Sequence, residues 1–103
     1  MEIDNDLKLL AETDETYASF SAELDYEKDK IKHTKGMFVT KSNSSVSKAQ
    51  EEFYGSEEYK IAIEKIFGAQ TSVNLLRNKR ATAMLRIDVW RTLEASRRKG
   101  NIQ

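Results

Sequence analysis

Few residues in this sequence have the types and spacing that acid–base or metal chemistry needs. The one histidine, His33, stands four residues after Asp29, so the two side chains share a face if this segment is helical. A metal site needs further ligands, and the sequence places no second histidine and no additional acid beside this pair. Carboxylate pairs such as Asp25 with Asp29 lie in predicted helices, whereas general acid–base catalysis needs a shielded pocket.

Sequence motifs of catalysis are absent as well. There is no glycine-rich phosphate loop and no nucleophile motif. The sequence therefore predicts a protein that is not an enzyme, with no catalytic residue, no metal and no cofactor.

Basic and aromatic residues are interleaved between residues 28 and 59. Single-stranded nucleic acid binds such surfaces because lysines contact phosphates and flat rings stack on unpaired bases. The alternative is that the rings fill a small core at the tip of a helical hairpin, while the lysines keep that tip solvated. The candidate nucleic-acid contacts are Lys28, Lys32, Lys35, Lys41, Lys48 and Tyr54, with Phe38, Phe53 and Tyr59 as neighbouring rings.

The formal net charge is zero, but the charges are unevenly distributed. Residues 1–29 hold ten acidic and two basic residues, a net charge of −8, and residues 76–103 hold two acidic and eight basic residues, a net charge of +6. Such asymmetry can indicate a nucleic-acid surface. The alternative is that the acidic start of one helix lies beside the basic end of another, with Arg86, Arg91 and Arg97 as the basic partners.

Apolar residues repeat at helical spacing in two long stretches. In residues 3–40 they recur every seven residues, and in residues 57–99 they alternate between steps of three and four, which is the pattern of helix-on-helix packing. Only Arg80 interrupts the second series, and a charged residue at such a position can fix register or oligomeric state. Trp90 is expected either in this packing seam or at a contact between subunits. The predicted seam residues are Tyr17, Leu24, Ile31, Ile66, Val73, Leu76, Ile87 and Trp90.

These patterns predict an all-α fold, a long antiparallel helical hairpin of coiled-coil type with a short helix at its tip. We expect one domain over residues 1–103, with a helix over about 3–40, a polar loop over 41–45, a short helix over 46–54 and a long helix over 57–99. Ser45 or Ser47 can cap the short helix, and Gly55 suits its end. A thin seam buries a small part of the chain's surface, so we also expect a homo-oligomer.

Composition restricts the cellular setting. The sequence has no cysteine and no proline, so it predicts neither disulfides nor a thiolate metal site. Residues 1–15 are acidic and lack the apolar core of a signal peptide, and no apolar run is long enough to span a membrane. A cytoplasmic protein without membrane contact is expected.

Two segments carry a resemblance to a known family. Residues 48–56 read KAQEEFYGS, a lysine-led segment that ends in two aromatic residues and a glycine, and residues 87–91 read IDVWR. Both resemble segments of the UvsY family of bacteriophage recombination mediators, and of small helical proteins from phage recombination regions. The likeness is specific over about the last sixty residues. This chain is shorter than typical members and has Gln50 where the family carries a second basic residue, which weakens the transfer of a DNA contact to that position.

The resemblance implies a specific function. Such mediators are oligomeric helical hairpins without catalytic activity, which bind single-stranded DNA and help to load a RecA-like recombinase in place of a single-strand-binding protein. By motif position Lys48 would contact DNA, and Trp90 would belong to the packing or assembly seam. The protein would then act in the host cytosol if a phage encodes it. The alternative function is a structural or adaptor hairpin that binds a partner protein and no nucleic acid.

Overall fold

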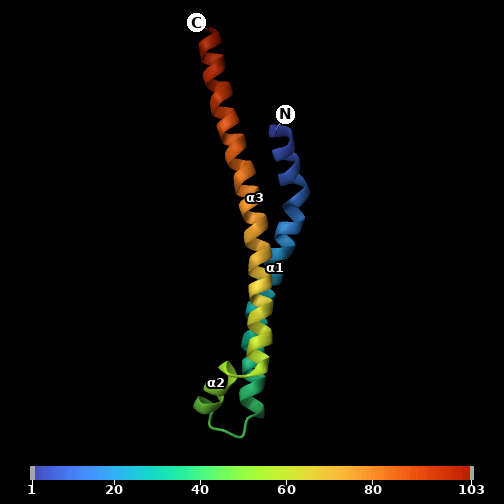
Figure 1. Ribbon diagram of the computed structural model, residues 1–103, viewed down its shortest axis with the longest axis vertical. Coiled ribbons are helices and arrows are strands. Elements are labelled where there is room, and N and C mark those ends of the chain that lie inside the picture. The colour runs from blue at the N-terminus through green and yellow to red at the C-terminus, as the bar shows by residue number, and fades with distance from the viewer. Residues whose placement is uncertain (1, 103) are drawn as a thin grey trace. The chain divides into compact units, whose positions relative to one another are not determined.

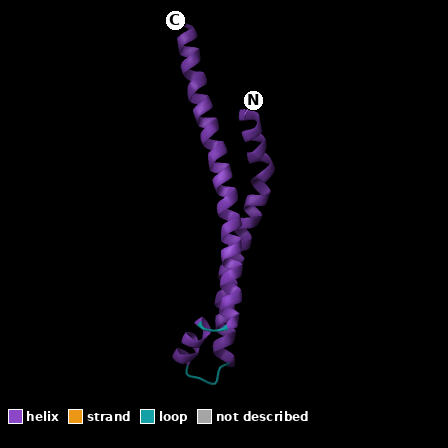
Figure 2. Ribbon diagram, viewed as in Figure 1, coloured by secondary structure: helices purple, strands orange, loops and turns teal. Residues whose placement is uncertain are grey.

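The computed structural model describes the backbone of residues 2–102 and the side chains of residues 3–100. It contains three helices, α1 (Glu2–Lys41), α2 (Val46–Tyr54) and α3 (Glu57–Ile102), and no strand lies within residues 2–102 (Figures 1 and 2). The predicted all-α helical hairpin is therefore confirmed. α2 has the predicted bounds, whereas α1 and α3 are slightly longer than the ranges 3–40 and 57–99.

The chain forms two compact units, which are described separately. Unit 1 combines residues 1–18 with residues 74–103, and unit 2 consists of residues 19–73. α1 and α3 pass through both units, and α2 belongs to unit 2. In each unit a segment of α1 packs against a segment of α3 that runs in the opposite direction.

Unit 2 has its core where α2 folds onto the two long helices. Phe53 is the largest fully buried side chain, and its ring centroid lies 5.6 Å from those of Phe38 and Tyr59. Ala49, one turn earlier on α2, is also buried. α2 therefore docks through one apolar face, and the rings of Phe38 and Phe53 belong to a core, as the alternative interpretation of the aromatic residues predicted.

Hydrogen bonds from serines set the ends of the helices at this tip. The Ser45 Oγ accepts the N–H of Lys48 at 3.4 Å, so Ser45 caps α2, and Ser47 falls inside the helix. Gly55 ends α2 with a φ of −98°, an ordinary right-handed value. Two residues later α3 begins, where the Ser56 Oγ accepts the N–H of Tyr59 at 3.2 Å.

The predicted seam runs through both units with one exception. Leu24, Val73 and Ile87 are buried, and the other seam residues are half-buried except Trp90. Trp90 keeps 37% of its surface exposed, so its placement in a buried seam is corrected for the single chain. The reason is that Trp90 lies near the first turn of α1, where it lines a groove together with Ile3, and α3 continues past that turn in unit 1 (Figure 1).

Arg80 occupies its seam position by bonding to α1 within unit 1. Its Nη1 donates to the backbone oxygen of Leu10 at 2.9 Å and to the Thr13 Oγ1 at 2.8 Å. Its Nη2 pairs with the Asp14 carboxylate at 3.2 Å, and its guanidinium carbon lies 5.4 Å from the ring centroid of Tyr17. The side chain is only 15% exposed. These contacts tie Arg80 of α3 to residues 10–17 of α1, as a register-setting residue requires, and its role in register or oligomeric state stays a prediction.

None of the helices, over the residues that the structure describes, combines the length and apolarity needed to cross a membrane.

Candidate nucleic-acid interface

The six residues predicted to contact nucleic acid all lie in unit 2. Five of them are exposed, and Lys35 is half-buried. Exposure is what a charged contact surface requires, but a binding site also needs these side chains on one side of the unit.

Lys28, Lys32 and Lys35 meet that requirement. They are separated by four and three residues, which places them on one side of α1 because consecutive residues turn by about 100°. Lys28 and Lys35 occupy the half-step positions beside the seam, so the row runs along the edge of the packed helices.

Lys35 links this row to α2. Its Nζ donates to the Tyr54 Oη at 2.9 Å and lies 4.8 Å from the centroid of the same ring. Tyr54 is nevertheless 55% exposed, since its ring packs edge-on against Phe53 and Tyr59 and leaves the rest of its surface open. Lys35 and Tyr54 are nineteen residues apart in the sequence, and the fold brings this exposed ring beside the lysine row.

The positive charge of Lys32 is partly neutralised by an acidic residue on the same helix. Its Nζ lies 3.9 Å from an oxygen of Asp29, and both side chains are about four-fifths exposed. Such exposed pairs contribute about 0–1 kcal/mol, so a phosphate can replace the carboxylate at little cost.

Lys41 and Lys48 do not join the row. Lys41 lies about 120–180° around α1 from the three lysines, at a groove of 520 Å³ on the other side of the seam, together with His33, Phe38 and Glu58. Lys48 and Tyr54 lie on opposite flanks of the buried face of α2, six residues apart. The candidate interface therefore contains four of the six predicted residues, Lys28, Lys32, Lys35 and Tyr54.

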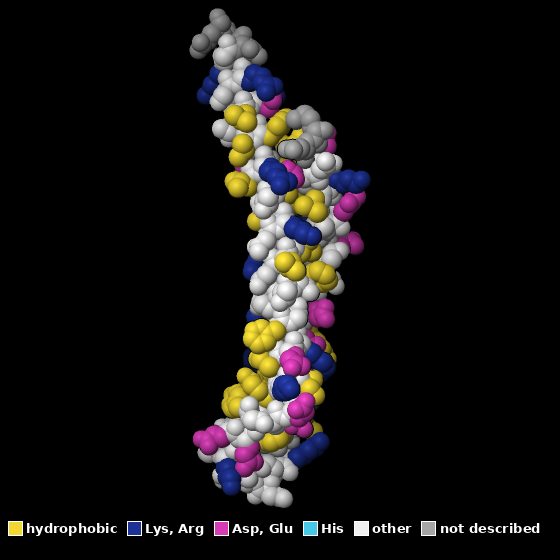
Figure 3. Space-filling view, viewed as in Figure 1, with side chains coloured by type: hydrophobic (Ala, Val, Ile, Leu, Met, Phe, Trp, Pro, Cys, Tyr) yellow, Lys and Arg dark blue, Asp and Glu magenta, His cyan; other side chains and the backbone are white. Residues whose placement is uncertain are grey.

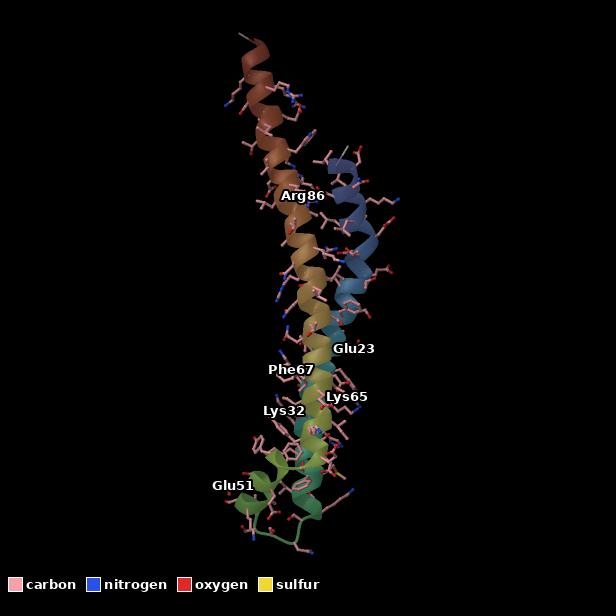
Figure 4. The ribbon with its side chains drawn as sticks, in the orientation of Figure 1. Glu23, Lys32, Glu51, Lys65, Phe67 and Arg86 are labelled. Atoms are coloured by element: carbon pink, nitrogen blue, oxygen red, sulfur yellow. The ribbon has the colours of Figure 1, made fainter. Side chains whose placement is uncertain are left out.

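The sequence prediction missed Phe67. This residue of α3 is 65% exposed, and it lies on the same side of unit 2 as Lys32, whereas Lys65 lies on the opposite side (Figure 4). A signal was available, because Phe67 falls directly after the seam residue Ile66 and so cannot face α1. We call Lys28, Lys32, Lys35, Tyr54 and Phe67 the lysine face.

The histidine is not part of any metal cluster. Within the described part of the chain, no group of three or more histidine, cysteine or acidic residues is arranged to hold a metal ion.

Among the described residues of unit 1, the acidic start of α1 and the basic end of α3 form fewer ion pairs than the charge distribution predicted. Arg86 pairs with Asp6 at 3.1 Å between α3 and α1. By contrast, Arg91 pairs with Asp88, and Arg97 pairs with Glu94, both within α3. Among the side chains that the structure describes, Arg86 is the one of these three arginines that pairs with the acidic start of α1.

Comparisons with protein-family models, with curated proteins and with solved structures find no match to this chain. The resemblance to phage recombination mediators thus stays a prediction.

Proposed function

We propose that this protein is an oligomeric single-stranded-DNA-binding protein of the phage recombination-mediator type. It would bind DNA through the lysine face and assist a RecA-like recombinase in replacing a single-strand-binding protein. The resemblance of residues 48–56 and 87–91 to the UvsY family supplies the recombination context, and the lysine face supplies the binding chemistry.

The observation that carries this proposal is the pair of exposed rings, Tyr54 in contact with Lys35 and Phe67 on the same side of unit 2 as Lys32 (Figure 4). Phe67 keeps 65% of its surface exposed, so its ring is accessible for a base to stack on. Unpaired bases are suitable ligands because bases of any sequence can stack on aromatic rings while the lysines bind the phosphates.

Affinity must come from this local cluster. Unit 2 contains nine acidic and eight basic residues, so it has no general attraction for a polyanion. Several copies on one strand would multiply a weak contact, which is why an oligomer belongs to the proposal.

The test is fluorescence anisotropy of a labelled single-stranded oligonucleotide, titrated with protein at several salt concentrations. Replacing Lys28 and Lys32 together by alanine should weaken binding and lower the slope of log affinity against log salt by about 1.4, because each lost phosphate contact contributes about 0.7. The matched control is Lys41→Ala with Lys65→Ala, which removes the same charge from the other side of unit 2 and should leave the slope unchanged. Absence of binding by the unmodified protein at low salt refutes the proposal.

The rings are tested separately from the charges. Phe67→Ala should weaken binding by about 5- to 150-fold, the loss of one stacked base, without changing the salt slope. Tyr26→Ala is the aromatic control, because Tyr26 is 60% exposed but lies about 160° around α1 from Lys28. Equal effects of the two substitutions would contradict a stacking role for Phe67.

A second candidate function is an adaptor hairpin that binds a partner protein. The observation that favours it is the exposed apolar side chains near the end of α3 in unit 1, Leu85, Val89 and Leu93. It becomes the preferred function if the oligonucleotide does not bind.

A further inference from the structure

The hydrogen bond between Lys35 and Tyr54 fixes the positions of two polar groups on the lysine face. The Lys35 Nζ donates to the Tyr54 Oη at 2.9 Å, and Lys35 is half-buried, whereas Lys28 and Lys32 are exposed. On the visible face of unit 2, basic side chains are scattered among acidic and apolar ones and form no continuous patch (Figure 3). The geometry of individual contacts therefore matters more here than the summed charge.

The Tyr54 hydroxyl is held in place by the core of unit 2. The Tyr54 ring packs edge-on with Phe53 and Tyr59, at centroid separations of 5.7 Å and 5.2 Å. Phe53 is fully buried, so this cluster of rings anchors the end of α2. A long lysine side chain normally loses much conformational freedom when it binds a ligand, and a lysine that is already held loses less. The pair therefore presents two donors in fixed positions.

The direction of the hydrogen bond leaves donors available on both side chains. A protonated lysine has three N–H donors and no acceptor, so the Tyr54 Oη must be the acceptor. The O–H proton of Tyr54 is not used in this bond, and neither are two of the N–H bonds of Lys35. Tyr54 is 55% exposed, so a ligand can reach the pair. A suitable ligand must bring acceptor oxygens and negative charge.

A phosphate group matches these two donors. Its oxygens form charge-assisted hydrogen bonds of about 2.7–2.9 Å with N–H donors and about 2.5–2.7 Å with O–H donors. The Nζ of Lys35 and the Oη of Tyr54 lie 2.9 Å apart, so each can bond to a different oxygen of the same phosphate. The pair is therefore built for one phosphate and not for a flat apolar ligand.

The charges around the pair allow an anion to bind. One helical turn from Lys35 on α1 lie four residues, none of them acidic: Ile31, Lys32, Phe38 and Val39. On α2 the acidic residue Glu51 precedes Tyr54 by one turn. Glu51 is exposed, so water and salt keep its repulsion of an anion weak.

We propose that Lys35 and Tyr54 together bind one internal phosphate of the DNA strand, Lys35 through an N–H bond and Tyr54 through its O–H bond. The inference rests on the proposed function for its ligand. It gives Tyr54 a role that a stacking ring does not have, because the hydroxyl becomes the group that binding requires. Phe67 then supplies a ring for base stacking on the lysine face.

The first experiment uses inorganic phosphate and no DNA. The nuclear magnetic resonance signals of Lys35 and Tyr54 are followed while phosphate replaces chloride at constant ionic strength, up to about 50 mM, which exceeds the millimolar Kd of a weak site. Both residues should shift in the unmodified protein. Tyr54→Phe should raise the Kd for phosphate by about 2- to 13-fold, the contribution of one hydrogen bond.

The matched control is Tyr26→Phe. Tyr26 is also an exposed tyrosine beside a lysine, with the Lys30 Nζ 5.8 Å from its ring centroid, and its substitution should leave the Kd of the Lys35 site unchanged. Absence of a phosphate-dependent shift at Lys35 would overturn the proposed pair. Equal phosphate binding by the Tyr54→Phe variant and the unmodified protein would overturn the role of the hydroxyl.

An oligonucleotide titration tests which phosphate is bound. Tyr54→Phe keeps an aromatic ring, so a ring that only stacks predicts unchanged affinity, whereas the proposed bond predicts a loss of about 2- to 13-fold. The loss should be equal for strands with and without a 5′-phosphate, and a loss confined to 5′-phosphorylated strands would overturn the assignment to an internal phosphate.

Salt dependence separates the two side chains. Tyr54→Phe removes no charge and should leave the salt slope unchanged, whereas Lys35→Ala should lower it by about 0.7. In the Lys35→Ala background, Tyr54→Phe should have a smaller effect, because the two residues bind one group; fully additive effects would contradict a shared phosphate. If inorganic phosphate binds the pair but no oligonucleotide binds the unmodified protein, the proposed function is refuted and the phosphate-binding pair stands.

Discussion

Truncating Arg80 to alanine should destabilise the protein although it removes a charge from an apolar seam. The side chain is 15% exposed and makes its bonds to Leu10, Thr13 and Asp14 on α1. The two bonds from Nη1 contribute about 1 kcal/mol each, and the exposed Asp14 pair contributes about 0–1 kcal/mol. Packing of the guanidinium on Tyr17 adds about 0.5–1 kcal/mol.

The loss of stability on truncation should not exceed the sum of these contributions. The Thr13 hydroxyl still donates to the Leu9 carbonyl, and Asp14 is 77% exposed and becomes hydrated, so the change leaves no new buried polar group. We therefore expect Arg80→Ala to lower the free energy of unfolding by roughly 2.5–4 kcal/mol. The assay is urea denaturation followed by circular dichroism at fixed protein concentration, since association would shift the apparent stability.

Leucine at position 80 separates stability from register. Arg80→Leu restores the apolar series and should leave the free energy of unfolding within about 1 kcal/mol of the unmodified protein. The hydrogen bonds that define the pairing of α1 with α3 are lost, so the amide resonances of unit 1 should show more than one set.

The control is Arg77→Ala, because Arg77 is exposed and its hydrogen bond goes to Asn74 on its own helix. This control should change the stability by less than about 0.5 kcal/mol. If Arg80→Ala loses no more stability than Arg77→Ala, Arg80 does not hold α3 against α1, and the reasoning is refuted.

Three further substitutions test the packing and the helix ends. Phe53→Ala should cost about 3–5 kcal/mol, because a fully buried ring is lost, and hydrogen exchange should show α2 opening first; ordinary protection in α2 would contradict its docking through Phe53. Ser56→Ala should lower stability by about 1 kcal/mol in urea denaturation, through the lost bond to the N–H of Tyr59, and no change would mean that this cap is unimportant. Gly68→Ala should raise the melting temperature, with a gain of about 0.5–1 kcal/mol, because an added methyl group meets nothing within 4 Å; a lower melting temperature would indicate a contact at this side of α3.

The sequence was sufficient to predict the helices and the faces on which they pack. Seam residues such as Leu24 and Val73 are buried where their spacing indicated, because a heptad repeat on a helix of known period fixes which side is apolar. The same local rule could have separated Lys41 from Lys28 and marked Phe67 as lying outside the seam, since both follow from rotation around one helix.

Only the tertiary structure decided which distant residues meet. The contacts of Lys35 with Tyr54 and of Asp6 with Arg86 depend on how α2 folds back and on the register of α1 against α3. The spacing of Trp90 continues the series of seam residues, yet Trp90 is exposed because α3 extends beyond the first turn of α1 in unit 1. Periodicity specifies a face of a helix but not the length of the partner that covers it, and that difference creates both the exposed tryptophan and the groove beside it.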